Sequence, residues 1–362
     1  METENALVFG EADRITRGEL QLAARNHGIP LEALRYSITP VGLHYLLTHY
    51  DIADVDPDRW RLEVDGAVER PLQLGVGDLR VRDRSTSVVT MECAGNGRAL
   101  LDPRPVSQPW LLEAVGTASW SGVPVATILE EAGVCDDAVE VVFTGADRGT
   151  EGGEEQNYQR ALTLAEVRRP EVLLADEMNG APLLPQHGAP VRLVTPGWYG
   201  MTNVKWLTRM TAVTEPFAGY QQERAYRMRA DESDTGVPLS RIEPRALMVP
   251  PGIPDFLTRK RTIAAAPVVV AGRAWSGWGA IAEVEVSVDG GDTWSAAVVD
   301  PPELGPWAWQ AWTYHWDATP GDHVLCCRAA DGTGRRQAAR LDWNVGGYAT
   351  ALTQQVFVAV TT

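Results

Sequence analysis

The sequence predicts an α+β protein of two domains, in which a mixed α/β domain is followed by an immunoglobulin-like β-sandwich. A length of 362 residues allows two domains of about 150 residues each. The first part of the chain mixes strand and helix patterns, whereas from residue 268 onward short strand patterns alternate with Asp-Gly turns. Eight of the 13 tryptophans fall between Trp275 and Trp343, where we expect them to pack the sandwich core and an interface; a sugar-binding stripe is the alternative.

Hydrophobic periodicity predicts the elements of the first domain. Residues 1–35 are polar, contain a helical pattern near residues 20–24, and are expected to form an N-terminal extension. Further along the chain we expect strands at residues 60–66, 87–90 and 139–147 and a helix at residues 126–132 that ends at Gly133. Residues 148–157 are acidic and rich in glycine, and they are predicted to form a loop.

The second domain is delimited by composition and by strand patterns. Prolines at residues 238–254 and the basic run at residues 259–261 predict a linker over residues 221–260. Strands are expected at residues 283–288, 307–316 and 323–330. The sandwich is therefore assigned to residues 261–347, and residues 348–362 are expected to be a C-terminal tail.

Composition excludes several classes of partner. A net charge of −16 argues against binding to nucleic acid or to anionic membrane surfaces. No apolar run approaches the roughly 18 residues that a membrane span needs. Residues 1–9 carry acids and no basic region, so we expect no secretory signal and a cytoplasmic location, or a periplasmic one if a leader has been removed. Four cysteines are too few for a disulfide scaffold in a chain of this length.

The stretch around Cys93 carries the strongest chemical signal. A β-branched strand pattern at residues 87–90 leads to the cysteine, and two glycines and an asparagine follow it within four residues. This places one thiol at the end of a strand, beside backbone that a bulky ligand can approach closely. The alternative is a buried structural cysteine next to a turn.

Cys93-Ala94-Gly95-Asn96, followed by Arg98, resembles the molybdenum-ligating segment of the sulfite oxidase family, in particular of its bacterial members without a haem domain. The similarity extends over about residues 36–347, including residues 110–124, 173–180 and 183–207. It implies a molybdenum–molybdopterin cofactor, a sulfite-oxidase-type catalytic domain at residues 36–220, and a sandwich that forms a homodimer. It also implies that the Cys93 thiolate binds the metal, a soft ligand for a soft site.

The same resemblance implies roles for other residues. His187, Arg192 and Lys205 would hold the cofactor, together with His49, which aligns with a family histidine. Arg98, Trp110 and Tyr226 would line the approach of the substrate, with Arg98 orienting an oxygen and Tyr226 donating a hydrogen bond. The alternatives are a histidine satisfied near a turn for His49, core packing for Trp110, separate surface charges for the three cofactor residues, and Tyr220 in place of Tyr226.

Three positions depart from the family pattern. Leu47, Gly97 and Gly346 stand where the family has arginines. An Arg-Asn-His run does occur at residues 25–27, but it precedes the family's Ile-Thr-Pro segment instead of following it, and we interpret it as a solvated helix end.

The activity that the resemblance implies is oxygen-atom transfer, with oxidation of sulfite to sulfate as the first candidate. Because sulfite carries about two negative charges and favours several cations, the missing arginines also admit reduction of a neutral S-oxide or N-oxide. A two-domain binding protein without catalysis is the third alternative. An enzyme of this kind needs a small-molecule substrate and an external electron acceptor, either oxygen or a carrier protein.

Overall fold

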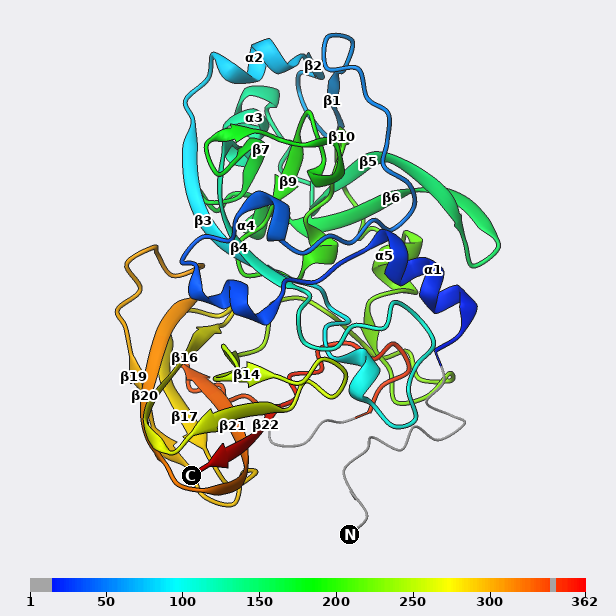
Figure 1. Cartoon of the computed structure of the whole chain (residues 1–362). Helices are drawn as coiled ribbons and strands as arrows, with labels where there is room; N and C mark the ends of the chain where they lie inside the picture. The colour runs from blue at the N-terminus through cyan, green and yellow to red at the C-terminus, as the bar shows by residue number, and fades with distance from the viewer. Residues whose placement is uncertain (1–14, 339–342) are drawn as a thin grey trace.

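The structure is a computed structural model that describes residues 15–338 and 343–362, and it shows two domains (Figure 1). The upper domain in Figure 1 runs from blue to green, and the lower one from yellow to red. Residues 1–14 of the expected N-terminal extension lie outside the described residues, as does the segment on which the predicted cytoplasmic location rests. Within the described ranges, no helix has the length and apolarity that a membrane crossing requires.

The helices are few and short. Thr16 caps the first of them in a capping box with Glu19, whose carboxylate accepts from the Thr16 N–H at 2.8 Å. The α-helices are α1 (Arg17–Arg25), α2 (Val76–Arg80), α3 (Val125–Ala132), α4 (Leu164–Val167) and α5 (Tyr220–Glu223). Single 3-10 turns occur at Leu31–Arg35, Val41–Leu43, Arg98–Leu100, Pro185–His187 and Gly200–Thr202. The expected helix at residues 126–132 is confirmed as α3, which ends because Gly133 adopts a left-handed conformation with φ 68°.

Two five-stranded sheets form the first domain. One has the order β2-β1-β10-β5-β6, with β2 (Leu72–Leu74), β1 (Leu62–Gly66), β10 (Leu207–Val213), β5 (Glu140–Glu151) and β6 (Glu154–Thr163). The other has the order β3-β4-β7-β8, with β3 (Ser85–Glu92), β4 (Val115–Pro124), β7 (Leu173–Met178), β8 (Ala181–Pro182) and, paired with β7, β9 (Arg192–Val194). Only the β1–β10 pair among these described strands is parallel. The mixed α/β domain predicted from the sequence is thus confirmed.

The predicted loop at residues 148–157 is wrong. Strand β5 continues to Glu151 and β6 begins at Glu154, so the two strands form a long hairpin joined by two residues. Those residues, Gly152 and Gly153, have φ values of 62° and 84°. Two consecutive positive φ values suit a two-residue hairpin turn, which glycine adopts without strain. The hairpin brings Glu151 to the wall of a pocket described below.

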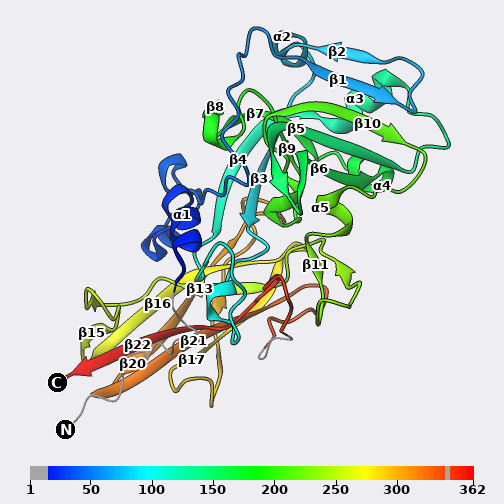
Figure 2. The same ribbon diagram turned by 90° about the vertical axis from the view of Figure 1, so that its right-hand side faces the viewer.

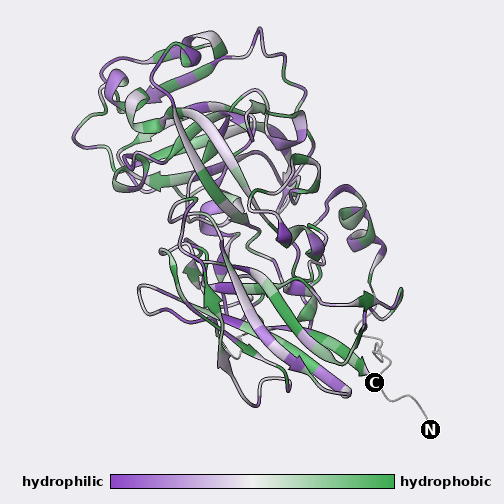
Figure 3. Cartoon of the chain, turned by 60° about the vertical axis from the view of Figure 1, so that its left-hand side comes forward, coloured by the Kyte–Doolittle hydropathy of each residue, from purple (hydrophilic) through white to green (hydrophobic). Residues whose placement is uncertain are grey.

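The second domain is a β-sandwich, as expected. One sheet has the order β13-β16-β20-β19, with β13 (Arg245–Met248), β16 (Ala266–Trp275), β20 (Gln310–Ala318) and β19 (Val298–Val299). The other has the order β14-β15-β22-β21-β17-β18, with β14 (Ile253–Pro254), β15 (Arg261–Ala264), β22 (Gln354–Thr361), β21 (Gly321–Asp331), β17 (Ile281–Ser287) and β18 (Ser295–Ala296). Hydrophobic and hydrophilic residues alternate along its strands (Figure 3), and Trp312 and Val284 from the two sheets share one buried core.

The expected linker and tail both contribute strands to this sandwich. Strand β13 falls inside the predicted linker at residues 221–260 and pairs with β16. It is fully buried because Ala246 and Met248 pack into the sandwich core and Leu247 packs into the core of the first domain. The predicted tail at residues 348–362 contains β22, which lies between β15 and β21. Its alternating valines, Val356, Val358 and Val360, face the core, and this alternation is visible in the sequence. A small ribbon of β11 (Arg227–Met228) and β12 (Val237–Pro238) completes the linker region.

Strand β3, which leads to Cys93, is fastened to the second domain (Figure 2). The Thr90 N–H donates to the Trp307 carbonyl at 2.8 Å, and the Thr90 hydroxyl accepts from the Trp309 N–H at 2.7 Å. Glu92 forms a buried ion pair with Arg245 of β13, and its other oxygen accepts from the Trp275 indole at 2.8 Å. The sandwich therefore fixes the end of the strand that carries the thiol.

Candidate molybdopterin site

Cys93 lies one residue beyond β3 and is 7% exposed. Its backbone N–H donates to the Ala114 carbonyl at 2.9 Å, and its carbonyl accepts from the Asn96 N–H at 3.0 Å, so both peptide groups are fixed. Burial raises the pKa of the Cys93 thiol, while nearby Arg98, the Gly95 N–H and the Trp110 indole act in the opposite direction. A thiol in this surrounding needs a metal to hold it as a thiolate.

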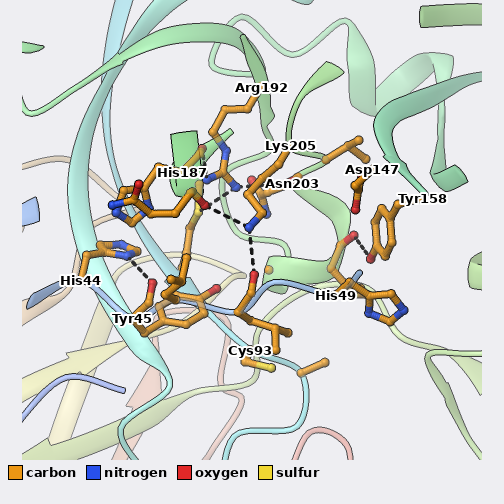
Figure 4. Close-up of a pocket in the computed structure, with 18 of the residues that line it drawn as sticks. His44, Tyr45, His49, Cys93, Asp147, Tyr158, His187, Arg192, Asn203 and Lys205 are labelled. Carbon is orange, nitrogen blue, oxygen red and sulfur yellow. Dashed lines mark hydrogen bonds between the residues drawn. The ribbon is translucent and has the colours of Figure 1, made fainter. Parts of the chain in front are cut away.

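Two pockets meet at this residue. The first, which we call the cationic pocket, has an empty volume of about 710 Å³ and contains the basic side chains of His44, His187, Arg192 and Lys205 (Figure 4). The second, which we call the Trp110 pocket, has an empty volume of about 840 Å³. Four residues line both pockets: Leu47, His49, Cys93 and Tyr226. The thiol thus stands at the boundary between a space for one ligand and a space for another.

Backbone carbonyls hold the basic groups of the cationic pocket. The Arg192 guanidinium, on β9, donates to the carbonyls of His187 at 3.1 Å and Asn203 at 3.0 Å, and lies 4.8 Å from the centre of the Trp120 ring. The Lys205 ammonium donates to the carbonyls of Leu47 at 3.0 Å and Gln186 at 3.1 Å. Neither cation has a carboxylate ion-pair partner among the described residues, although buried charges are ordinarily paired.

The electrostatics of this pocket favour an anion. Burial lowers the pKa of Lys205 to about 7 and that of Arg192 to about 10, and the Arg192 charge lowers the Lys205 pKa further. Burial and the neighbouring basic groups lower the pKa of His187 to about 3. A phosphate would relieve this repulsion and supply the negative charge that the two cations lack as an ion-pair partner.

Among the described residues that line the cationic pocket, Asp147 is the one carboxylate, and it was not singled out from the sequence. Burial raises its pKa to about 6, and its Oδ1 is buried without a hydrogen-bond partner. His44 Nε2 in the same pocket is also buried without a hydrogen-bond partner. Unpaired polar atoms of this kind fit a ligand that carries both donors and acceptors, as the pterin part of molybdopterin does. On these observations the pocket fits the expected cofactor.

The residues predicted to meet the substrate lie together in the Trp110 pocket. Arg98 is 6% exposed, and its Nε donates to the Gly346 carbonyl at 2.8 Å. Trp110 and Tyr226 are buried in the same wall, and burial raises the pKa of Tyr226 well above its usual value, so the phenol stays protonated. His49 also lines this pocket, but its Nε2 lies 2.8 Å from the Glu151 carboxylate. The roles of these residues stay predictions, while their placement around Cys93 is what those roles require.

The structure gives physical reasons for two of the three missing arginines. Gly97 has φ 99°, and a Cβ there would collide with the Thr350 side chain. A Cβ on Gly346 would collide with the ring of Tyr348. That ring lies 5.1 Å from the Arg98 guanidinium and 5.3 Å from the Tyr226 ring, so an aromatic group occupies the neighbourhood of the missing cation.

The interpretation of residues 25–27 as a solvated helix end is wrong for Asn26. This side chain is 5% exposed, donates to Gln108 at 2.9 Å and accepts from the Thr48 N–H at 2.7 Å. Asn26 and Gln108 both line the Trp110 pocket. Sequence reasoning missed them, together with Glu151 and Tyr348, because their partners lie far away along the chain.

A buried thiol that lines both a cationic pocket and the Trp110 pocket is the arrangement expected of a site where a bound cofactor meets a substrate. Comparison with known proteins specifies the class. The family model described as "Oxidoreductase molybdopterin binding domain" matches residues 49–221, and "Mo-co oxidoreductase dimerisation domain" matches residues 247–360.

Similar proteins agree with these matches. The chain is 35% identical over 310 residues to mitochondrial sulfite oxidase of Homo sapiens, covering 81% of this chain and 56% of that protein. It is 33% identical over 329 residues to sulfite oxidase of Gallus gallus, covering 86% and 70%, and 29% identical over 339 residues to NADH nitrate reductase of Spinacia oleracea, covering 86% and 36%. The crystal structure of the sulfane dehydrogenase SoxCD from Paracoccus pantotrophus matches with a TM-score of 0.78 at 25% identity, over 99% of this chain and 92% of that one.

The chain belongs to the sulfite oxidase family of molybdopterin-dependent oxidoreductases. The expectation of a molybdenum cofactor is confirmed, and the chain is an enzyme of the sulfite oxidase type. It spans 56% to 63% of the length of the first two mammalian relatives.

Replacing Lys205 by methionine is expected to lower cofactor retention about 10- to 100-fold, because a charge-assisted phosphate contact is lost. Phosphate binding raises the Lys205 pKa from its value of about 7 in the cofactor-free chain, so binding takes up a proton. Affinity should therefore fall as the pH rises above about 7 in the native chain, and this part of the pH dependence should disappear in Lys205→Met. Pterin fluorescence and molybdenum content after dialysis at several pH values measure both effects.

The matched control is Arg209→Met, because Arg209 is half exposed and pairs with Asp65 away from both pockets. It should retain the cofactor and its pH dependence. Equal retention by the two variants would contradict the assignment of Lys205.

Proposed function

We propose that this chain is a molybdenum-cofactor-dependent enzyme that transfers an oxygen atom to a sulfur oxyanion, with sulfite as the leading substrate. The observation that supports it most is the position of Cys93, which joins a pocket suited to the cofactor to a pocket that contains Arg98. When bound, the cofactor supplies the oxygen-atom transfer and the two-electron change. The balanced conversion is sulfite plus water to sulfate, two protons and two electrons, which leave to an external acceptor.

The residues on the two sides of the thiol have different roles in this reaction. Arg192, Lys205 and His187 hold the cofactor on one side. On the other side, Arg98 attracts an oxyanion, Tyr226 offers a phenolic O–H, and Trp110 helps to exclude water. Burial of Cys93 keeps competing ligands away from the metal.

A second candidate is reduction of a neutral S-oxide or N-oxide. It is favoured by the small number of cations in the Trp110 pocket, where Arg98 is the one arginine among the described lining residues. Neutral oxides need fewer positive partners than sulfite does.

The two candidates are separated by the direction of turnover in protein that contains about one molybdenum per chain. If the first candidate is correct, the enzyme should reduce ferricyanide with electrons from sulfite. It should then fail to oxidise reduced viologen with methionine sulfoxide or trimethylamine oxide. The opposite pattern would favour the second candidate. Full molybdenum content without turnover in any assay would contradict both, and absence of molybdenum from cells that make the cofactor would favour a non-catalytic binding protein.

We also propose that the chain is a homodimer joined through its dimerisation domain. The β14–β15 hairpin exposes Ile253, Phe256 and Leu257 at 77%, 85% and 85%, a grouping of large apolar side chains that suits a buried interface. The double substitution of Phe256 and Leu257 by aspartate should convert the dimer to a monomer in light scattering. Val81→Asp, which changes an apolar residue of similar 84% exposure in the first domain, should leave the dimer intact. A dimer that survives the double substitution would exclude this surface as the dimer interface.

The cytoplasmic location is also a proposal, which cell fractionation tests.

A further inference from the structure

The Trp110 pocket contains a carboxylate, Glu151, which is unusual beside a substrate expected to be an anion. Glu151 is the last residue of β5, and its side chain is 32% exposed. Its Oε2 accepts from Gln221 at 2.6 Å, from Tyr50 at 3.4 Å, and is 2.8 Å from His49 Nε2. These partners come from two separate parts of the chain, residues 49–50 and Gln221, so the carboxylate is held in place.

One oxygen of this carboxylate is available. All the side-chain contacts of Glu151 within the described residues reach Oε2, and Oε1 accepts no hydrogen bond there. The partners lower the pKa of Glu151 against the opposing effect of burial, so it remains ionised at neutral pH. An ionised carboxylate with a free oxygen at a pocket wall is suited to accept from a cationic group of a ligand.

The charges of the pocket are balanced. Its described lining contains one arginine, Arg98, one carboxylate, Glu151, and one histidine, His49, which faces that carboxylate. Arg98 donates to backbone carbonyls and has no ion-pair partner among the described residues. A dianion would meet one cation and one like charge, whereas a zwitterion would find a partner for each of its ends.

We propose that Glu151 makes this pocket selective for a zwitterionic sulfur oxyanion, an aminoalkyl sulfinate, whose sulfinate lies at Arg98 and whose ammonium group lies at Glu151 Oε1. This inference rests on the proposed function and deepens it by naming the substrate class. The sulfur lone pair forms one new S–O bond, and the oxygen derives from water. The sulfinate plus water gives the sulfonate, two protons and two electrons, and the electrons leave to the external acceptor.

The first test compares two substrates that differ only in the amino group, 2-aminoethanesulfinate and ethanesulfinate, in the cofactor-loaded enzyme. The native enzyme should show a kcat/KM about 10- to 100-fold higher for the amino compound, the range expected for one charge-assisted contact. Glu151→Gln keeps an acceptor for its neighbours but removes the charge, and it should reduce this ratio to about one. It should also raise kcat/KM for sulfite, because a like charge is removed.

The matched control is Glu154→Gln, which changes the first residue of β6 just across the same turn. Glu154 is exposed and does not line the pocket, so the substrate ratio should be unchanged. If the ratio of kcat/KM values for the two sulfinates fell to about one in both variants, the cause would be the general charge of the hairpin, and the proposal would be overturned.

Binding provides a readout that does not depend on turnover. Calorimetry with 2-aminoethanesulfonate and ethanesulfonate, the unreactive product pair, should show tighter binding of the amino compound to native protein and equal binding to Glu151→Gln. Equal binding by native protein, no binding of either compound, or a preference that survives in Glu151→Gln would each overturn the proposal. If sulfite is oxidised without any amino preference, the proposed function stands and this inference fails. If no substrate turns over, the proposed function fails, and the binding comparison still decides the role of Glu151.

Discussion

Replacement of Cys93 by serine is expected to lower turnover more than about 100-fold while the fold is retained. Loss of residues that merely support a metal ligand commonly costs 10- to 100-fold, and the ligand itself should matter more. Serine offers a harder oxygen donor with little tendency to ionise, which suits the metal poorly. The expected spectroscopic sign is loss of the cysteine-thiolate contribution to the sulfur-to-molybdenum charge-transfer absorption, measured together with turnover and molybdenum content.

Cys135→Ser is the control for that experiment, because Cys135 is a free cysteine that lines neither pocket. Its turnover and spectrum should match those of the native enzyme. Native turnover in Cys93→Ser would remove the assignment of the metal ligand, even if the protein still contained molybdenum.

Replacement of Arg245 by methionine is expected to destabilise the protein by about 3–5 kcal/mol, because it leaves the Glu92 carboxylate buried without its cation. The two side chains are 2% and 3% exposed, so water cannot take the place of the missing partner. The Asn96 amide at 3.0 Å and the Trp275 indole would still donate to Glu92, but they carry no charge. Urea unfolding followed by tryptophan fluorescence measures the change in the free energy of unfolding.

The comparison is with the exposed pair of Lys260 and Asp322, whose side chains are 39% and 72% exposed. Lys260→Met should change the free energy of unfolding by no more than about 1 kcal/mol. If Arg245→Met were equally mild, the buried pair would not be what fastens β3 to the sandwich. Cofactor content measured in parallel should fall with Arg245→Met, since Glu92 immediately precedes Cys93.

Much of the fold could be predicted because the signals for its helices and strands lie within short stretches of sequence. Helix α3 has its apolar face and its terminal glycine within a short stretch of sequence, and β17 alternates plainly. The hairpin at Gly152 and Gly153 was missed because an acidic, glycine-rich composition is also typical of loops. Strand β13 was missed because the prolines around it indicate a linker, while its burial comes from packing against distant parts of the chain.

The site was predictable to the extent that its residues lie in a recognisable motif. Cys93, Arg192 and Lys205, which line one pocket, were singled out because family-like sequence surrounds them. Glu151 and Tyr348 could not be found in this way, because each acquires its position from partners about a hundred or more residues away. The balance of charge in the Trp110 pocket, on which the proposed substrate selection rests, therefore became visible only in three dimensions.

The loop after Cys93 is completed by residues from the far end of the chain. The Thr350 hydroxyl donates to the Asn96 carbonyl, the Ala349 N–H donates to the Ala94 carbonyl at 2.8 Å, and the Gly346 carbonyl accepts from Arg98. During vectorial synthesis on the ribosome, these partners emerge roughly 250 residues after the thiol does. The loop after Cys93 consequently cannot take up its final contacts before residues 346–350 have been synthesised.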